Sequence, residues 1–329
     1  MKIINKQPRT ATLAVTYRCN SRCRMCNIWR SKIADSLKPA DYLKLPKSLN
    51  DINITGGEPF LRDDLLEILD SIFKRCNPER LVISSNGFLT DRIVGLAKII
   101  LKRSYADRVI IALSLDALGK KHNEIRGVVN AFELVINTIT ELKRIGFNNI
   151  GLGFTFISGN EDQYLPVYEF AKKNNLNFGA TIAHNAENYF STDNNEKPDY
   201  KIIKKQTDYY IGEKIESFKK NELGKCYYMH GLAYYARTGK ALVNCDAMRG
   251  SFFIDPRGNI YPCNILTDIA GNLLEADFKN IWQSRAADKI RCKTKNCPTA
   301  CWMVCTAKPG IKKHWLKTGL WLIKRKLKQ

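Results

Sequence analysis

From residue 11 to about residue 182, short apolar runs alternate with longer stretches in which apolar residues recur with helical spacing. Short runs that are almost wholly apolar are typical of parallel strands, which are buried on both faces. Between the runs, residues such as Leu65, Leu69 and Ile72 fall on one helical face. Six βα units predict an α/β fold with a parallel sheet, either a partial barrel or a doubly wound sheet. The predicted strands are Ala11–Thr16, Ile52–Thr55, Leu81–Ser85, Val109–Leu115, Ile150–Phe156 and Asn177–Ile182.

The pattern of alternating apolar runs and helical stretches changes in the second half of the chain. Asp193–Pro198 is polar and predicts a loop, after which helical spacing covers Asp199–Lys220 and then Tyr227–Arg237. From Cys245 onward the βα alternation stops and cysteines become frequent. We therefore place a domain boundary near residue 220. The predicted parts are residues 10–220, a cysteine-rich domain at residues 221–305 and a basic tail at residues 306–329.

Composition narrows the class of protein. Of 329 residues, 44% are hydrophobic and 26% are charged, which is typical of a soluble globular protein and excludes a disordered or fibrous chain. The first ten residues are too polar for a signal peptide, and no run of about 18 apolar residues could span a membrane. We therefore expect a cytoplasmic, reducing location, where clustered cysteines indicate metal or redox chemistry more often than disulfides.

Three of the eleven cysteines lie close together after the first predicted strand. Cys19, Cys23 and Cys26 form the pattern C-x3-C-x2-C, and thiolates at this spacing can converge on one zinc ion or one iron–sulfur cluster. A structural zinc site needs four ligands, and the nearest further candidates are Cys76 and His122. Three thiolates with an open fourth position favour a 4Fe–4S cluster, with zinc as the alternative.

Two more motifs accompany this triad: TGGEP at residues 55–59 and SSNG at residues 84–87, each directly after a predicted strand. Together with the triad they resemble the radical S-adenosylmethionine (radical SAM) superfamily. The resemblance implies a partial (β/α)6 TIM-like barrel in which the triad holds a 4Fe–4S cluster and SAM binds the open iron. Met25 departs from the family pattern, in which an aromatic residue is more usual before the third cysteine.

Polar or turn-forming residues follow all six predicted strands, and in parallel α/β folds these strand ends form the active site. Gly56 and Gly57 lack Cβ atoms, so backbone can approach a ligand closely there. Glu58, followed by Pro59, offers an anionic acceptor for the SAM ammonium group. His184 follows the last strand, where it is either catalytic or a structural hydrogen-bonding residue.

The next strand ends complete the predicted SAM site. Ser84 and Asn86 can hydrogen-bond ribose hydroxyls, and the resemblance places Ser114 and Asp116 against SAM or substrate. Arg126 resembles the arginine that pairs with the SAM carboxylate, for which its forked donors are suited. Two simpler interpretations stay open, in which Asp116 caps the following helix and Arg126 forms a surface ion pair. The predicted SAM-binding set is Met25, Gly56, Gly57, Glu58, Pro59, Ser84, Asn86, Ser114, Asp116 and Arg126.

A second group of cysteines begins at Cys245, which is followed by twelve residues, Gly258, four residues and Cys263. This spacing resembles the SPASM and twitch extensions of radical SAM enzymes, which hold auxiliary 4Fe–4S clusters. Residues 255–263 also predict a β-hairpin with an Arg-Gly-Asn turn, with Cys263 on the return strand. The remaining candidate metal ligands are Cys292, Cys297, Cys301 and Cys305.

The later cysteines depart from the full SPASM spacing, and no cysteine follows Cys305. Two complete auxiliary clusters would need about seven or eight thiol ligands, and six are available, or seven if Cys226 joins them, so a single auxiliary cluster is favoured. At least one auxiliary 4Fe–4S cluster is predicted, held most firmly by Cys245, Cys263 and Cys305 with Cys297 or Cys301. A second cluster with an open iron and a four-cysteine zinc site are the alternatives. Cys76, at the end of an apolar helical stretch, is predicted to be a packed core thiol.

The tail from Thr306 contains seven Lys, one Arg and no acidic residue, within a chain of formal net charge +21. Its residues Leu316, Leu320, Ile323 and Leu327 share a helical face that is flanked by Lys317, Lys324 and Lys328. This pattern is typical of a basic amphipathic helix on an anionic membrane. A terminal helix docked on the protein is the alternative. Nucleic-acid binding is not favoured, because no RNA-binding motif is present.

The resemblance implies an enzyme that reductively cleaves SAM to a 5′-deoxyadenosyl radical and abstracts hydrogen from a substrate. We expect an oxidoreductase acting on a small or lipid-linked, membrane-associated metabolite such as a sugar or lipid intermediate. Its electrons would come from an external donor such as a flavodoxin or ferredoxin. A ribosomal peptide maturase is the alternative within the superfamily. A non-catalytic zinc- or iron-binding interaction protein is the alternative outside it.

Overall fold

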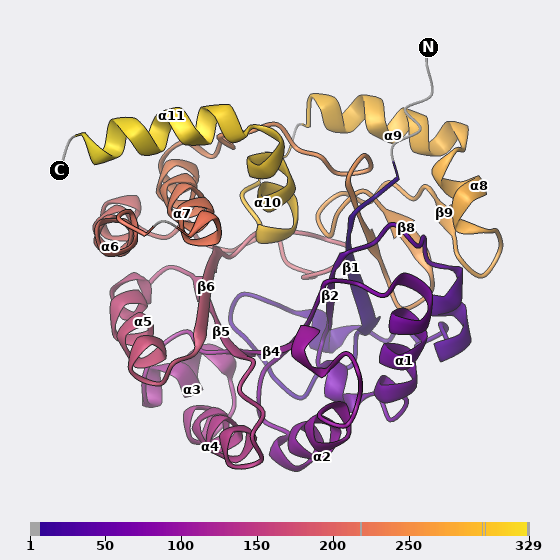
Figure 1. Cartoon of the computed structure of the whole chain (residues 1–329), viewed down its shortest axis with the longest axis horizontal. Helices are drawn as coiled ribbons and strands as arrows, with labels where there is room; N and C mark the ends of the chain where they lie inside the picture. Colours follow the sequence, from indigo (N-terminus) through magenta and orange to yellow (C-terminus); the bar gives the residue numbers. More distant parts are fainter. Residues whose placement is uncertain (1–6, 218, 298, 300, 328–329) are drawn as a thin grey trace.

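The computed structural model describes residues 7–217, 219–297, 299 and 301–327 (Figure 1). Six parallel strands lie in the order β6-β5-β4-β3-β2-β1, which is the order of the chain itself. A doubly wound sheet would reverse its order at a switch point, so the prediction of a partial barrel is confirmed. The predicted strands are confirmed as β1 (Thr10–Thr16), β2 (Asp51–Gly56), β3 (Arg80–Ser85), β4 (Val109–Ser114), β5 (Ile150–Phe156) and β6 (Asn177–Ile182).

Helices cover the outside of these strands, as Figure 1 shows for the lower half of the molecule. The first of them buries one apolar face, which includes Leu65, Leu69 and Ile72, and ends at Asn77 in the left-handed conformation. Cys76 packs in the main core beside that end, so the prediction of a core thiol is confirmed. These helices are α1 (Leu65–Cys76), α2 (Thr90–Ile100), α3 (Lys120–Arg126), α4 (Ala131–Arg144) and α5 (Tyr164–Lys173). Short 3-10 helices occur at Ile28–Arg30, Pro39–Lys44, Pro59–Leu61, Ala106–Arg108 and Glu161–Gln163.

The cysteine-rich segment extends the same sheet. Strand β7 (Ser251–Ile254) pairs in parallel with β1, and β8 (Asn259–Tyr261) and β9 (Gly271–Asn272) follow as antiparallel neighbours. The predicted hairpin is therefore confirmed, with Gly258 at φ +89° in its turn. Within the described residues, the strands form one nine-stranded sheet that continues from the barrel into the segment that carries the second group of cysteines.

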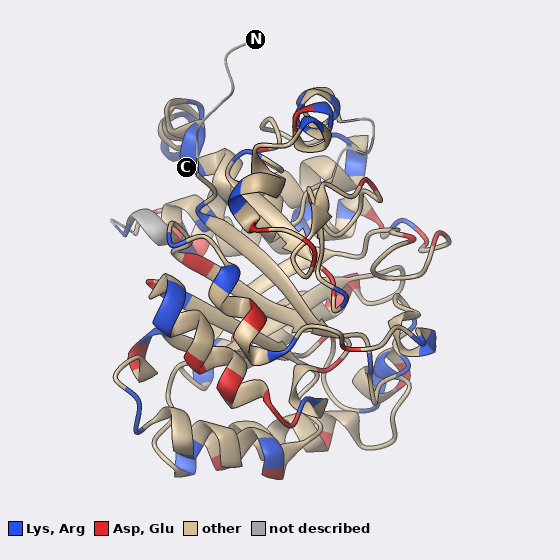
Figure 2. Ribbon diagram, turned by 90° about the vertical axis from the view of Figure 1, so that its right-hand side faces the viewer, with Lys and Arg blue, Asp and Glu red and all other residues tan. Residues whose placement is uncertain are grey.

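Helices close the gap that the curved sheet leaves between its outer strand β6 and β1. Helix α7 (Lys220–Thr238) contacts β6, while α10 (Val304–Lys313) contacts β1, β7 and α7. The sequence pattern predicts a single helix at Asp199–Lys220. In the structure, α6 covers only Tyr200–Lys214, and Lys220 is the first residue of α7. Helices α8 (Phe278–Trp282) and α9 (Arg285–Lys295) follow the hairpin. The strands in the middle carry few charged residues, and Lys, Arg, Asp and Glu lie mostly on the surrounding helices and loops (Figure 2).

The basic tail forms two helices, α10 and α11 (Trp315–Lys326), which are separated at His314. Helix α11 lies along the outside of the molecule, next to α7 (Figure 1). The predicted flanking residue Lys328 lies outside the described residues. In the described part of the chain, every helix is too short or too polar to cross a membrane.

Candidate active site

The triad loop and the GGEP stretch are held against each other by backbone hydrogen bonds. The Gly57 amide donates to the Thr16 carbonyl at 2.8 Å, and the Glu58 amide donates to the Arg18 carbonyl at 2.9 Å. A Cβ atom on Gly57 would lie 2.2 Å from the Arg18 oxygen and 2.8 Å from the Cys19 Cβ. The close approach that requires glycine here is therefore an approach to the triad loop itself.

Glu58 joins the ends of β2 and β3. Its buried carboxylate accepts hydrogen bonds from the Ser85 hydroxyl at 2.9 Å, the Asn86 amide at 2.7 Å and the Phe60 amide at 3.1 Å. A carboxylate can accept about four hydrogen bonds, so these three leave one acceptor position of the fully buried side chain unused. Burial raises the pKa of Glu58 to about 7, against the opposing effect of its hydrogen bonds. Its role toward SAM stays a prediction.

Of the other predicted strand-end residues, Asn86 contacts the triad loop directly. The Asn86 side chain donates to the Asn20 side chain within the triad loop at 2.6 Å, and Ser84 donates to Asn53 at 2.9 Å. Met25 is buried among apolar side chains such as Ile125. Pro59 begins the 3-10 turn that follows Glu58, and Ser114 ends β4.

Asp116 and Arg126 form a buried ion pair, with 2.5 Å between Asp116 Oδ2 and Arg126 Nη2. Asp116 Oδ1 accepts from the Thr155 amide at 2.8 Å, and the Arg126 Nη1 atom lies 3.6 Å from the Cys23 sulfur. Neither simpler interpretation therefore describes these residues, because Gly119 precedes the following helix as its N-cap and Arg126 is buried. The pair places a positive charge beside one triad thiol.

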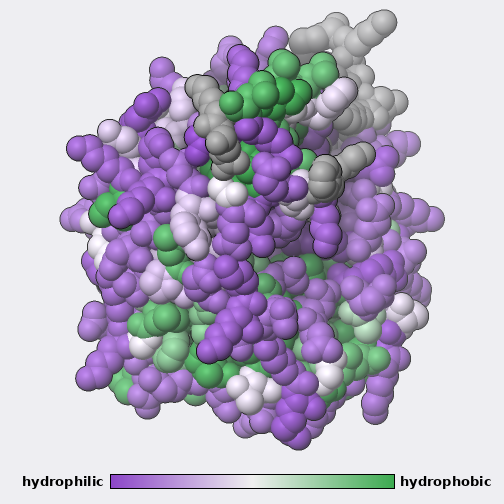
Figure 3. Space-filling view, turned by 60° about the vertical axis from the view of Figure 1, so that its left-hand side comes forward, coloured by the Kyte–Doolittle hydropathy of each residue, from purple (hydrophilic) through white to green (hydrophobic). Residues whose placement is uncertain are grey.

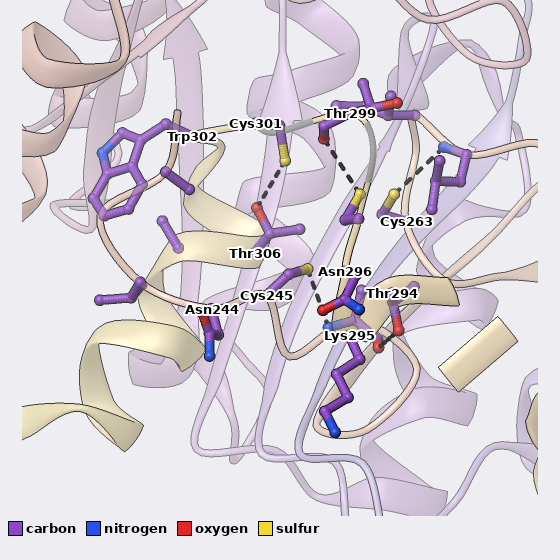
Figure 4. A pocket seen from close by; sticks show the side chains of 17 residues that line it. Asn244, Cys245, Cys263, Thr294, Lys295, Asn296, Thr299, Cys301, Trp302 and Thr306 are labelled. Atoms are coloured by element: carbon purple, nitrogen blue, oxygen red, sulfur yellow. Dashed lines mark hydrogen bonds between the residues drawn. The ribbon is translucent and has the colours of Figure 1, made fainter. Parts of the chain in front are cut away.

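The second group of cysteines lines a cavity of about 240 Å³ between the hairpin and the segment before α10 (Figure 4). This volume is several times the ~30 Å³ that a water molecule occupies in the liquid. The cavity is lined by the side chains of Cys245, Cys263, Cys297 and Cys301. In Figure 4 the labelled sulfur atoms face a common space.

Backbone groups also reach these sulfur atoms. The Ala247 amide lies 3.4 Å from the Cys245 sulfur, and the Leu266 amide lies 3.4 Å from the Cys263 sulfur. Hydrogen bonds of this kind stabilise thiolates and tune the potential of a bound cluster. Because thiolates are the usual ligands of 4Fe–4S clusters, the four thiols that line the cavity are candidate ligands of one such cluster.

The remaining cysteines have different surroundings. Cys305 lies beside the cavity, where it shares a smaller space with Cys263, while Cys292 is exposed on α9 and does not line the cavity. Cys226 is buried in the main core. The structure therefore brings Cys297 and Cys301 together with Cys245 and Cys263, and it does not bring Cys292 or Cys226 to them.

Comparison with protein families supplies the deciding observation. Residues 13–171 match the model of the radical SAM superfamily, and residues 245–306 match that of the SPASM iron–sulfur cluster-binding domain. The chain belongs to the radical SAM superfamily. Its triad loop lies within the first match, and the cysteine-lined cavity is formed within the second. The cavity lies within the SPASM match, and its role as the cluster site stays a prediction.

Among curated relatives, a probable GTP 3',8-cyclase from Sulfolobus acidocaldarius is 30% identical over 171 residues, 50% of this chain and 52% of the relative. The subtilosin biosynthesis protein AlbA from Bacillus subtilis is 24% identical over 294 residues, 86% of this chain and 61% of the relative. The matches thus span between half and two thirds of these relatives' own lengths.

Solved structures show the same fold at low sequence identity. SuiB from Streptococcus suis, bound to S-adenosylmethionine, has a TM-score of 0.65 and 16% identity, covering 87% of this chain and 68% of SuiB. The structure of anSMEcpe with bound AdoMet and a peptide has a TM-score of 0.66 and 15% identity, covering 97% of this chain and all of that one. The superposition therefore includes both cluster-binding parts.

The thiols of this radical SAM protein fit the clusters of its family. Burial raises the pKa of Cys19 and Cys26 to about 12, and it raises that of Cys245 to a similar value. These buried thiols are therefore protonated near neutral pH, and binding of iron must release their protons. At the triad, the positive charge of Arg126 acts in the opposite direction to burial and lowers the pKa of Cys26.

Aromatic side chains that the sequence pattern did not indicate form one wall of the radical SAM site. The Tyr189 hydroxyl donates to the Gly56 carbonyl at 3.0 Å and lies 2.8 Å from the Thr55 hydroxyl. Its ring belongs to an apolar cluster against which Cys19 and Cys26 pack. Tyr189 lies in a long loop without periodicity, so no sequence signal could have identified it.

Trp302 fixes the SPASM cysteine segment to the barrel. Its indole nitrogen donates to the Tyr228 carbonyl at 2.8 Å, and its backbone amide donates to His184 Nε2 at 3.2 Å. The other ring nitrogen of His184 lies 2.6 Å from the Ile182 carbonyl, so both nitrogens are engaged in structural hydrogen bonds. Burial lowers the pKa of His184 to about 4, which keeps the ring neutral as an acceptor for Trp302.

Proposed function

We propose that this protein is a radical SAM enzyme that modifies a polypeptide substrate with the help of one auxiliary iron–sulfur cluster. The main observation in support of this proposal is that β1 pairs with β7. This pairing joins the triad loop and the SPASM cavity to a single sheet. Among the curated relatives described, AlbA, a bacteriocin biosynthesis protein, matches over 86% of this chain. The cyclase match covers half of the chain.

When bound, the triad cluster and SAM supply one-electron chemistry that generates a species able to remove a hydrogen atom from a substrate. The residues of the chain orient and shield this chemistry. Glu58 offers its open acceptor position to the ligand ammonium group. Arg126 is held by Asp116 with its Nη1 atom 3.6 Å from the Cys23 sulfur, where it would orient that ligand. The wall around Tyr189 excludes water from the triad.

The SPASM cavity has a second task in this proposal. Its four thiols would hold a fully ligated cluster, which would accept or deliver an electron during substrate oxidation. The exposed Lys295 and the Asn296 side chain at the cavity edge offer polar contacts to a substrate. An external donor of the flavodoxin or ferredoxin type would reduce the triad cluster, and the chain's net charge of +21 favours such acidic partners.

A membrane-associated metabolite is the second candidate substrate. The exposed apolar side of α11 favours it, because a substrate embedded in a membrane would meet the enzyme there. The two candidates differ in a measurable way, since a polypeptide substrate is destroyed by a protease and a lipid-linked metabolite is not.

Reductive SAM cleavage tests the enzyme activity. Anaerobically reconstituted protein with dithionite and SAM should yield 5′-deoxyadenosine, and Cys23→Ala should abolish it. Cys76→Ala removes a core thiol far from the triad in sequence and should retain activity. Equal product from wild type and Cys23→Ala would overturn the proposal.

Size-fractionated extract of the source cells then tests the substrate class. A polypeptide fraction should stimulate 5′-deoxyadenosine formation above the substrate-free level. Treating that fraction with proteinase K, followed by inactivation of the protease, should remove the stimulation. Stimulation that survives the protease, or that follows a lipid extract, would instead support the metabolite.

A further inference from the structure

Helix α11 has apolar side chains on two opposite sides. On its inner side, Trp321 packs against Tyr227 and His230 of α7, with ring centroids 5.4 and 4.8 Å apart. Thr318 is buried on the same side. These contacts hold the helix against the body of the protein. The apolar residues on the inner side are therefore explained by packing within the protein.

The outer side forms an apolar stripe that no described part of the protein covers. The stripe has exposures of 63% for Leu316, 62% for Leu320, 59% for Ile323 and 82% for Leu327, and Trp315 at its start is 68% exposed. Spacing of three and four residues places the stripe on one line along about 18 Å of helix. Figure 3 shows hydrophobic atoms gathered at the top of the molecule, next to hydrophilic ones.

Basic side chains border this stripe. Lys317 and Lys324 are exposed beside it, and Lys312 and Lys313 are exposed at the end of α10. The acidic residues nearby are Asp208 on α6, Glu216 just after it and Asp246, which pair with Arg325, Lys326 and Lys313 respectively. The stripe is therefore bordered mainly by positive charge, and the chain contains no acid from Thr306 onward.

We infer that α11 docks on an anionic lipid surface, with the helix parallel to the membrane. The apolar stripe, which begins at a tryptophan, would contact the acyl chains, and the bordering lysines would contact the anionic headgroups. A second copy of this chain fits the stripe less well. It would bring net charges of +21 together. A stripe about 18 Å long on a helix about 10 Å wide also covers only about 180 Å², far below the ~800 Å² per partner of a stable interface.

Docking leaves the inner contacts of α11 in place. Because Trp321 stays packed on α7, the whole enzyme would move to the membrane without unfolding the tail. This inference is independent of the substrate class, since a polypeptide or a lipid-linked metabolite could equally be modified near a membrane.

Vesicle co-sedimentation with full-length, cluster-loaded protein tests the inference. The protein should partition onto phosphatidylglycerol–phosphatidylcholine vesicles at least about tenfold more strongly than onto pure phosphatidylcholine vesicles, and salt should reduce this preference. The triple variant Leu316→Ser, Leu320→Ser and Ile323→Ser should lose at least tenfold of the partitioning. The charge variant Lys317→Glu with Lys324→Glu should lose a similar amount.

A matched control changes exposed apolar residues elsewhere, with Ile99→Ser, Val129→Ser and Ile269→Ser. This control should partition like wild type, and 5′-deoxyadenosine formation without vesicles should be equal in all variants. Equal partitioning of the α11 triple variant and the control would overturn the inference. A vesicle-free dimer that the α11 triple variant abolishes would overturn it too, in favour of a second copy.

Discussion

Gly231 on α7 leaves the space into which the indole ring of Trp302 fits. A Cβ atom at residue 231 would lie 2.1 Å from two ring carbons of Trp302 and 2.6 Å from its nitrogen. Ordinary carbon contacts begin near 3.5 Å, so Gly231→Ala must push the ring away by more than about 1 Å. The ring is fully buried and hydrogen-bonded to Tyr228, so it has no free direction in which to move.

The magnitude follows from three contributions. Overpacking of a buried ring costs about 1–3 kcal/mol, and loss of the indole hydrogen bond costs about 1 kcal/mol more. Replacing glycine inside a helix returns about 1 kcal/mol. We therefore expect Gly231→Ala to lower the free energy of unfolding by about 1–3 kcal/mol. Because Trp302 directly follows Cys301, its displacement should also remove a ligand from the SPASM cavity.

The assay compares iron and sulfide content, unfolding and SAM cleavage in reconstituted protein. Gly231→Ala should lose about half of its iron, since one of two 4Fe–4S clusters is affected. Substrate-free SAM cleavage at the triad should persist. Gly224→Ala is the matched control on the same helix, because a Cβ atom there meets open space. If both variants carry full iron and unfold alike, the packing argument is wrong.

Three further predictions concern the radical SAM half and its link to the SPASM domain. Gly57→Ala should reduce 5′-deoxyadenosine formation by at least about 100-fold, because its Cβ would displace the triad loop at Arg18; activity within twofold of wild type would contradict this. Arg126→Met should cost about 3–5 kcal/mol in urea unfolding, and adding Asp116→Asn should restore most of it, whereas additive losses would exclude a coupled pair. The folded pKa of His184 is about 4, below the ordinary 6.5, so the unfolded state gains a proton first as the pH falls. Stability should therefore drop by up to about 3 kcal/mol between pH 6.5 and 4, and His184→Gln should show a shallower loss; parallel curves would refute the assignment.

The barrel strands could be predicted because their signal is local. A run such as Ile150–Phe156 is apolar almost throughout, and it is followed by turn residues and helical spacing, so neighbouring residues alone indicate the element. The pairing of β7 with β1 could not be predicted in this way. The apolar run Ser251–Ile254 shows that a buried strand is present, but nothing within it identifies the strand beside it.

The candidate site likewise has residues that the sequence could identify and contacts that it could not. The cysteine spacing and GGEP identified the triad loop, because those residues are close in sequence. The ion pair of Asp116 with Arg126 depends on how α3 packs, which the linear pattern does not contain. Cys292 shows a signal that could have been used, since α9 buries Ala287, Ile290 and Thr294, and position 292 falls off that helical face.

The central place of β1 has a consequence for synthesis of the chain on the ribosome. One edge of β1 can pair with β2 soon after it emerges, but the other edge waits for β7, whose residues come about 240 positions later. At about 5–20 residues per second this interval lasts roughly 10 to 50 s. An apolar strand with an open edge is prone to aggregate during that time. The nascent chain should therefore depend on a chaperone that shields Thr10–Leu13 until the SPASM segment has been made.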